Sequence, residues 1–188
     1  QAVYQRIRAS GVTLCPTVVT FKTLTNMEPY WNGNFTHSEY ISPGVTDLWK
    51  SLWTQQQNLP DFIWLNWMRM VVDLNKAGVP LMIGTDLMLP GIIPGYSVHE
   101  EMMIWQEAGI PPSDILRSAT IVPAQFMSLD DRLGSVSEGK TASMVLVRAN
   151  PLEDIGNAQQ IESVFLRGQY FSREDLDRLL AEAKKLAK

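Results

Sequence analysis

Asp86 is the side chain whose place in the sequence most directly indicates chemistry. It follows residues 80–83, a short apolar run bounded by Gly78 and Gly84, and this pattern predicts a buried strand. In α/β barrels the reacting groups lie on loops at the carboxyl ends of parallel strands. An aspartate just beyond a strand is therefore a candidate catalytic residue. The alternative is that Asp86 only tightens a turn through local hydrogen bonds.

The two histidines of the chain are weaker candidates. His99 opens a predicted helix together with Glu100 and Glu101, but the fourth residue after it is Met103, so the zinc-binding pattern His-Glu-x-x-His is absent. Acidic residues in a first helical turn are favoured by the helix dipole. Two interpretations remain for this segment: a dipole-stabilised helix start, or a start in which His99 faces a substrate. His37 lies in a polar loop, where we expect a solvated side chain, with a role in a lid as the alternative.

Composition and charge exclude several classes of protein. The formal net charge is -4, and no run of Lys and Arg precedes the C-terminal tail, so the chain lacks a nucleic-acid footprint. No apolar run reaches the roughly 18 residues that span a bilayer, which argues against a membrane partner. No signal peptide is visible, and the location in the cell stays open. The single Cys15 excludes an intrachain disulfide, and we expect it to be a buried structural thiol.

The order of predicted elements in the first two thirds is typical of a parallel sheet with covering helices. Apolar spacing and glycine stops predict the following: a helix at 2–9, a strand at 12–19, a long loop at 22–46, helices at 47–56 and 61–77 (or one helix broken near Pro60), a strand at 80–83, and helices at 98–108, 111–119 and 122–127. Helices and strands that alternate with short connections form such a sheet.

The spacing of apolar residues changes in the final third of the sequence. Short runs at 133–136, 143–147 and 161–170, separated by turn residues, predict a small antiparallel β unit. Ser172 followed by Asp175 resembles a capping box, which predicts the start of the last helix.

The order and spacing of several short motifs resemble the amidohydrolase superfamily, the metal-dependent hydrolases, and especially its imidazolonepropionase-like and metal-dependent dipeptidase branch. The matching segments are 10–19, 77–86 (AGVPLMIGTD), His99-Glu100, 108–120 (AGIPPSDILRSAT), Pro123-Ala124, 131–142 (DRLGSVSEGKTA), 150–155 (NPLEDI) and 164–170. No single motif is decisive, but together they cover most of the chain.

The resemblance implies an α/β fold: the C-terminal portion of a (β/α)8 TIM barrel, about strands 7–8 and their flanking helices, over residues 1–128. Part of a small β-sandwich, a composite domain, would follow at 129–171, and a C-terminal helix at 172–188. Because the chain begins abruptly within a predicted helix, we expect a fragment that was truncated or processed from a longer protein.

The resemblance also implies a function: hydrolysis of a C–N bond in a small-molecule substrate, a cyclic amide or a dipeptide-like compound. Asp86 would bind a divalent metal ion, zinc in the expected case, and take the proton from the metal-bound water. His99 would contact the substrate, and the loops at 22–42 and 87–96 would set specificity. The family's other metal ligands belong to earlier strands, so we expect the isolated chain to be inactive.

Two kinds of partner follow from these expectations. A partial barrel leaves an open sheet edge and a bare apolar face, so we expect a homo-oligomer or a complementing N-terminal fragment. The alternative function is a non-enzymatic structural or interaction module, a half-barrel that self-associates through that face.

Overall fold

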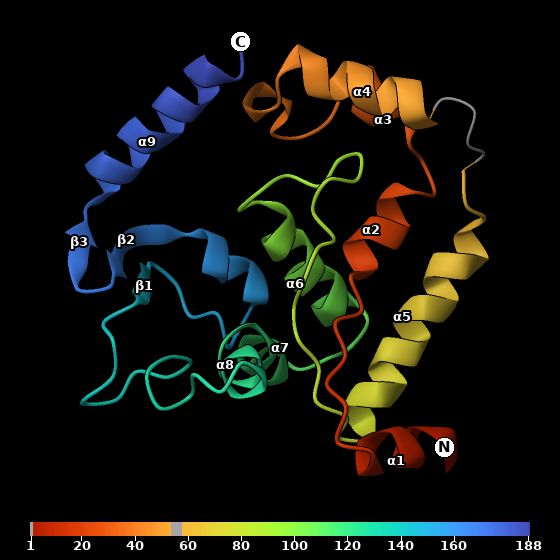
Figure 1. The fold of residues 1–188 in the computed structure, drawn as a ribbon, viewed down its shortest axis with the longest axis vertical. Helices are drawn as coiled ribbons and strands as arrows, with labels where there is room; N and C mark the ends of the chain where they lie inside the picture. Colours follow the sequence, from red (N-terminus) through yellow and green to blue (C-terminus); the bar gives the residue numbers. More distant parts are fainter. Residues whose placement is uncertain (1, 54–57) are drawn as a thin grey trace.

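The computed structural model describes residues 2–53 and 58–188. Figure 1 shows helices gathered around a central pair of extended segments, with the two ends of the chain at opposite ends of the molecule. The elements are α1 (Ala2–Ala9), α2 (Val18–Thr23), α3 (Glu28–Trp31), η1 (Ser38–Tyr40), α4 (Pro43–Trp53), α5 (Asp61–Lys76), α6 (Ser97–Glu107), α7 (Pro112–Ala119), α8 (Ile121–Phe126), β1 (Met144–Val147), η2 (Ile155–Gln159), β2 (Ile161–Leu166), β3 (Gln169–Phe171) and α9 (Arg173–Leu186).

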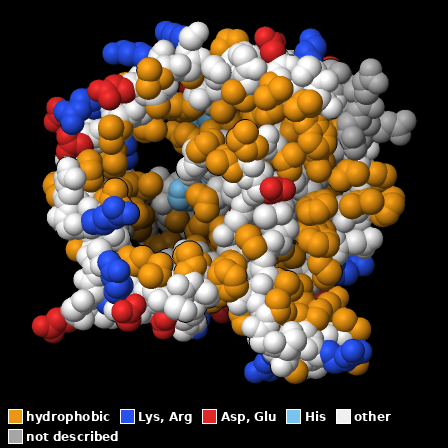
Figure 2. All heavy atoms as spheres, in the orientation of Figure 1, with side chains coloured by type: hydrophobic (Ala, Val, Ile, Leu, Met, Phe, Trp, Pro, Cys, Tyr) orange, Lys and Arg blue, Asp and Glu red, His pale blue; other side chains and the backbone are white. Residues whose placement is uncertain are grey.

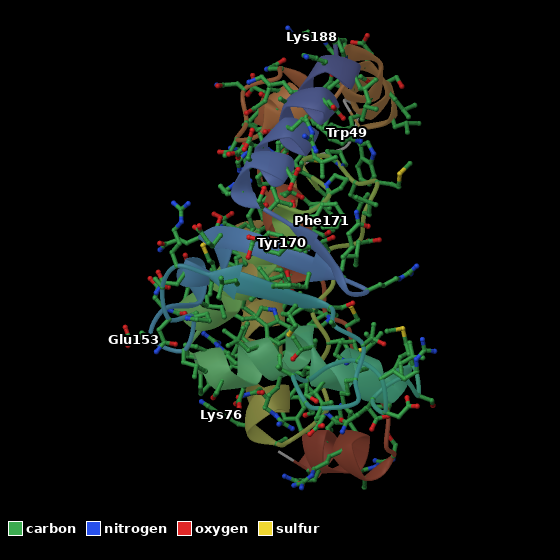
Figure 3. The ribbon with its side chains drawn as sticks, turned by 90° about the vertical axis from the view of Figure 1, so that its left-hand side faces the viewer. Trp49, Lys76, Glu153, Tyr170, Phe171 and Lys188 are labelled. Atoms are coloured by element: carbon green, nitrogen blue, oxygen red, sulfur yellow. The ribbon has the colours of Figure 1, made fainter. Side chains whose placement is uncertain are left out.

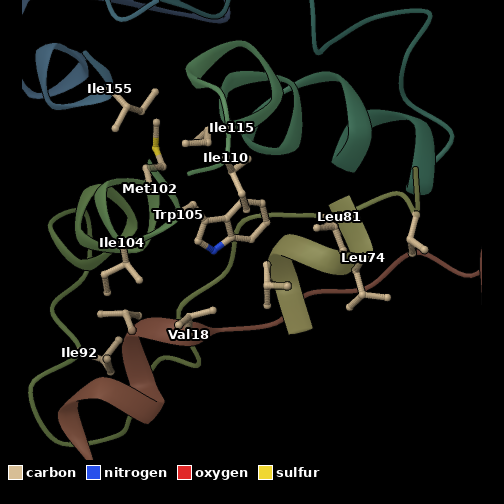
Figure 4. Close-up of a cluster of buried hydrophobic side chains, with 13 residues drawn as sticks. Val18, Leu74, Leu81, Ile92, Met102, Ile104, Trp105, Ile110, Ile115 and Ile155 are labelled. Atoms are coloured by element: carbon tan, nitrogen blue, oxygen red, sulfur yellow. The ribbon is translucent and has the colours of Figure 1, made fainter. Parts of the chain in front are cut away.

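The hydrophobic core lies between α2, α5, α6 and α7. Trp105 is 1% exposed and Ile115 is fully buried, and both belong to one cluster with Val71 and Leu74 of α5. Figure 4 shows Trp105 between the α6 side chains and the segment that carries Leu81. Because this core joins elements from both halves of the sequence, it fixes the loops that precede and follow α2 and α6.

Two extended segments run in the same direction at the centre of the fold. The Leu14 N–H donates to the Pro80 carbonyl at 3.0 Å, and the Met82 N–H donates to the Leu14 carbonyl at 2.8 Å. These bonds make an isolated parallel bridge between Leu14 and Leu81. The predicted strands at 12–19 and 80–83 are thus parallel neighbours, but each is reduced to a single bridged residue.

The predicted strand at 12–19 was wrong at its C-terminal end, where α2 begins at Val18. The first N–H groups of α2 do not pair with a neighbouring strand, because the side chain of Glu101 accepts hydrogen bonds from Val18 N–H and Val19 N–H. Pro16 has no N–H to give to a sheet, so the extended segment ends there.

The predicted loop at 22–46 was also wrong in part. It contains α3 and η1, and α4 begins at Pro43, ahead of the helix start expected at residue 47. Residues 54–56 of that predicted helix lie outside the described part of the chain. The helices predicted at 2–9, 61–77, 98–108 and 122–127 are confirmed within one residue at each end.

A three-stranded antiparallel sheet, in the order β1-β2-β3, follows the helical part. The strand predicted at 133–136 was wrong: this segment forms turns, and Val136 is 80% exposed. The Lys140 ammonium donates to the carbonyls of Asp130 and Leu133 at 2.5 and 3.3 Å. These two backbone carbonyls are therefore hydrogen-bonded by a side chain and not by a neighbouring strand.

Helix α9 leaves the sheet through a capping box. The Ser172 hydroxyl accepts from the Asp175 N–H, and the Asp175 carboxylate accepts from the Ser172 N–H, as the sequence predicted. Figure 3 shows the sheet, marked by Tyr170 and Phe171, at the base of α9. The far end of the helix, at Lys188, lies near the segment that carries Trp49. In the described part of the chain, none of the helices combines the length and apolar character needed to cross a bilayer.

Candidate functional site

Asp86 lies in the loop between the Leu81 bridge and α6, where it is exposed to solvent. Its φ of 53° is in the left-handed region, which aspartate tolerates better than most residues. The Thr20 hydroxyl donates to the carbonyl of Thr85 at 2.8 Å, so the residue before Asp86 is tied to α2. The aspartate therefore projects from the carboxyl end of a segment that has a parallel neighbour, on a loop that a buried side chain holds.

Cys15 lies beside this loop. The expectation that Cys15 is buried was wrong, because the residue as a whole is exposed to solvent. Its Sγ packs so close to Gly84 that a Cβ at Gly84 would come within 2.3 Å of it. Partial burial of the thiol raises the pKa of Cys15, and the negative charges of Glu101 and Asp86 raise it further. The thiol therefore stays protonated at neutral pH and is a poor nucleophile.

Glu101 organises the loops around Asp86. Its side chain has no exposed surface, and it accepts from Val18 N–H at 3.0 Å, Val19 N–H at 2.6 Å and the indole N–H of Trp105 at 2.7 Å. Burial raises the pKa of the Glu101 carboxyl, while these three donors oppose that rise. One side chain of α6 thus holds the N-terminal end of α2, whose Thr20 in turn binds the carbonyl next to Asp86.

The sequence analysis missed this role of Glu101. A signal was present, because positions 101, 104 and 105 form the buried i, i+3, i+4 stripe of α6. A glutamate within an apolar stripe must find hydrogen-bond donors. Trp105 is one such donor within the helix, but the other two, the N–H groups of Val18 and Val19, lie more than 80 residues away in the sequence.

His99 lines a cavity of about 380 Å³ that Asp86 does not border. The wall residues are His37, Pro94, Gly95, Tyr96, His99, Gln159, Ile161, Val164, Arg173, Leu176, Leu179 and Leu180. The Nδ1 atom of His99 is buried and has no hydrogen-bond partner among the described residues. His37 is not a freely solvated side chain, because its ring stacks on Tyr96 with 3.6 Å between centroids. The structure thus places the two histidines together and apart from Asp86.

Burial lowers the pKa of His99 below its ordinary value of about 6.5. The unfolded chain therefore binds the proton more readily, so the free energy of unfolding should fall as the pH drops through about 6.5. We expect wild type to lose more stability than His99→Gln between pH 7.5 and pH 5.5, by less than about 1.4 kcal/mol per pH unit. Urea unfolding at both pH values measures the difference, and equal losses in the two proteins would contradict it.

The described residues do not form a metal site by themselves. Within 2–53 and 58–188 no group of three or more His, Cys, Asp and Glu side chains is placed to hold a metal ion. A catalytic zinc takes about three protein ligands. Asp86 can supply one carboxylate ligand at most, so the described part of the chain alone does not fit a catalytic metal.

Comparison with known proteins identifies the family. The model of the amidohydrolase family matches residues 67–170, more than half of the chain. The chain therefore belongs to the amidohydrolase family, and the resemblance seen in the sequence is confirmed. No curated protein sequence matches it significantly.

Solved structures of this family share the fold. Bottromycin amidohydrolase is similar over 93% of this chain, with 23% identity and a TM-score of 0.75. A protein from Bifidobacterium longum named as a candidate prolidase is 25% identical over 92% of this chain, with a TM-score of 0.57. A prolidase complexed with N-methylphosphonate-L-proline is 24% identical over 92%, with a TM-score of 0.60. The chain spans 40%, 39% and 38% of these three structures, respectively.

Proposed function

We propose that this chain is part of an enzyme that hydrolyses the C–N bond of a small amide or dipeptide-like substrate, with Asp86 as its general base. One observation carries the proposal: an exposed carboxylate lies at the carboxyl end of a segment with a parallel neighbour, which is where this class of fold places reacting groups. Membership of the amidohydrolase family and the 25% identity to the Bifidobacterium protein support the substrate class.

In the proposed site, Asp86 accepts the proton of the water that attacks the amide carbon. A positioned carboxylate next to open solvent can take and release that proton. A divalent metal ion, which we propose is zinc, would lower the pKa of the attacking water when bound. Asp86 would be one of its ligands, and the other ligands would come from outside the described residues. His99 as a substrate contact remains a prediction, because its cavity and Asp86 are separate.

The architecture belongs to the same proposal. We propose that the segments around Leu14 and Leu81 correspond to strands 7 and 8 of a (β/α)8 barrel, within a partial barrel at residues 1–128. Residues 129–171 would then be part of a small β-sandwich domain, and residues 172–188 its C-terminal helix. The parallel bridge supports the assignment of the two strands, and the antiparallel sheet supports the change of architecture after the helical part.

The test is metal-dependent hydrolysis by the full-length enzyme that contains this chain. We expect a zinc-loaded preparation to cleave at least one member of a panel of Xaa-Pro dipeptides and cyclic amides. We also expect chelation to abolish the activity and added zinc to restore it. The 188-residue chain alone, assayed in parallel, is expected to show no turnover. Turnover that survives complete metal removal, or none across the panel, would overturn the proposal.

A second candidate function rests on the exposed apolar side chains of α4 and α5. Leu52 is 66% exposed and Phe62 is 61% exposed, and Leu48 and Leu65 are also exposed. Figure 2 shows that apolar side chains cover much of the visible surface. Such exposure is typical of an interaction surface, as expected of a structural module that self-associates or pairs with a complementing N-terminal fragment. A monomeric mass by light scattering at about 100 μM would count against self-association.

A further inference from the structure

The backbone directly before Asp86 is hydrogen-bonded to two helices that are distant in the sequence. The Ile83 N–H donates to the Ser118 carbonyl of α7 at 3.0 Å. The Thr20 hydroxyl of α2 donates to the Thr85 carbonyl at 2.8 Å. Figure 1 shows the extended segment that leads away from α5 beside the segment that leads into α2. Contacts from elsewhere in the fold therefore fix the chain up to the residue that precedes the proposed general base.

Asp86 has no side-chain restraint of its own in the described part of the chain. Its carboxylate is exposed, and among residues 2–53 and 58–188 it forms no ion pair. A carboxylate without such a contact takes its position from its own backbone. The tertiary hydrogen bond closest to that backbone is the one that Thr20 makes with the Thr85 carbonyl.

The hydroxyl of Thr20 does not bond within its own helix. Threonine in a helix commonly donates to a carbonyl three or four residues earlier. Thr23 does so, because its hydroxyl donates to the Thr20 carbonyl at 2.8 Å. The Thr20 hydroxyl instead binds a carbonyl that is 65 residues away in the sequence. Thr20 is 3% exposed, so loss of this bond would leave a buried donor without a partner.

The turn before α2 is what brings Thr20 to this position. Thr17 precedes the helix with a φ of 48°, a left-handed conformation that is rare for a β-branched residue. Its side chain does not cap the helix, and the Glu101 carboxylate accepts the first N–H groups of α2 instead. Non-glycine residues in such conformations concentrate at functional sites, where the surrounding structure maintains them. The unfavourable turn therefore points to a role for the helix that follows it.

Close packing at Gly84 restrains the same stretch of chain. A Cβ at Gly84 would lie 2.3 Å from the Sγ of Cys15 and 3.8 Å from the Cγ2 of Thr17. A larger residue would force the two segments apart. Because the segment that leads into α2 approaches Gly84 this closely, a displacement of α2 is transmitted to residues 84–86.

We propose that Thr20 is a positioning residue for Asp86 in amide hydrolysis. The inference rests on the proposed function, in which Asp86 is the general base. Thr20 acts through the Thr85 carbonyl and sets the distance between the Asp86 carboxylate and the attacking water. A misplacement of about 1 Å at a reacting group can lower the rate by about 10²-fold. Thr20 itself touches no reacting atom, so its contribution is to placement and not to proton transfer.

The test compares Thr20→Val with Thr20→Ser in the full-length, zinc-loaded enzyme. Valine matches threonine in shape but cannot donate, so we expect kcat per bound zinc to fall by about tenfold or more. We expect KM to stay within about threefold of wild type, because the loss concerns the reacting carboxylate and not substrate binding. Serine keeps the hydroxyl donor, so Thr20→Ser should retain kcat within about threefold of wild type.

Thr23→Val is the matched control. Thr23 belongs to the same helix and is 5% exposed, and its hydroxyl also donates to a backbone carbonyl. That carbonyl belongs to Thr20 and keeps a second donor, the Leu24 N–H at 3.1 Å. The same chemical change thus removes a bond that stays within α2, and kcat should remain within about twofold of wild type. If Thr20→Val does not fold, Thr20→Ala replaces it, because alanine and serine both lack the methyl group and only serine keeps the hydroxyl.

A double-mutant cycle with Asp86→Asn separates positioning from a general loss of structure. If Thr20 acts through Asp86, adding Thr20→Val to Asp86→Asn should lower kcat by less than about threefold. An equal loss from Thr20→Val in both backgrounds, equal kcat for Thr20→Val and Thr23→Val, or a loss that serine does not restore would overturn the role of Thr20 alone. A wild-type enzyme without metal-dependent turnover, or an Asp86→Asn enzyme with undiminished kcat, would overturn the proposed function on which that role rests.

Discussion

Glu101→Ala is expected to lower the free energy of unfolding by about 3 kcal/mol or more, the largest effect on stability that we predict for a single polar substitution. The substitution leaves the N–H groups of Val18 and Val19 and the indole N–H of Trp105 without their acceptor. Each buried donor that loses its partner costs about 1–3 kcal/mol. The cavity that the missing side chain leaves adds to this loss, because Glu101 is fully buried and the atoms packed around it can relax only in part.

Chemical denaturation measures this effect, with Glu107→Ala as the control. Glu107 belongs to the same helix but is exposed, so its substitution should change the stability by no more than about 0.5 kcal/mol. Glu101→Gln is expected to be intermediate, since an amide keeps one acceptor oxygen but turns an NH₂ group toward another donor. Similar losses for the Glu101 and Glu107 variants would show that the buried carboxylate does not organise α2.

The structural effect of substituting Glu101 should extend to the loop that carries Asp86. Thr20 is buried in α2 and holds the Thr85 carbonyl. When the N-terminal end of α2 loses Glu101, this contact weakens with it. Amide resonances of Thr85 and Asp86 are therefore expected to shift in Glu101→Gln, while those of β3 stay in place.

Local sequence patterns predicted the elements whose stabilising contacts are local. The helix at 61–77 follows from its apolar spacing and from Gly78, whose φ of 74° ends it. The capping box at Ser172 and Asp175 spans three residues and was visible for the same reason. In both segments the residues that decide the structure are neighbours in the chain.

Long-range contacts explain what the sequence did not reveal. Residues 18 and 19 read as a strand because they are β-branched, but a glutamate on α6 makes them the start of a helix. The two histidines were interpreted separately, whereas folding brings them to one cavity. At the candidate site the position of Asp86 beyond an extended segment was predictable, and its dependence on Thr20 was not. Pairings of this kind need tertiary structure, because no local rule links such distant positions.

Asp86→Asn is expected to lower kcat/KM of the full-length, zinc-loaded enzyme by about 10²–10⁴-fold. Asparagine matches aspartate in shape and also tolerates a positive φ, so the loop conformation at φ 53° should persist. The amide cannot accept the proton of the attacking water, so the loss should fall mainly on kcat. The free energy of unfolding should stay within about 0.5 kcal/mol of wild type, as is usual for an exposed substitution.

Asp131→Asn is the matched control, because Asp131 is also an exposed aspartate but belongs to a turn in the segment before the sheet. It should retain full activity. Zinc content measured on each variant separates the two roles proposed for Asp86. Full zinc occupancy with lost turnover isolates the proton acceptor, whereas lost zinc and lost turnover together identify the ligand. An Asp86→Asn enzyme that keeps more than half of its activity would place the general base elsewhere, since a neutral amide cannot replace a carboxylate in taking a proton.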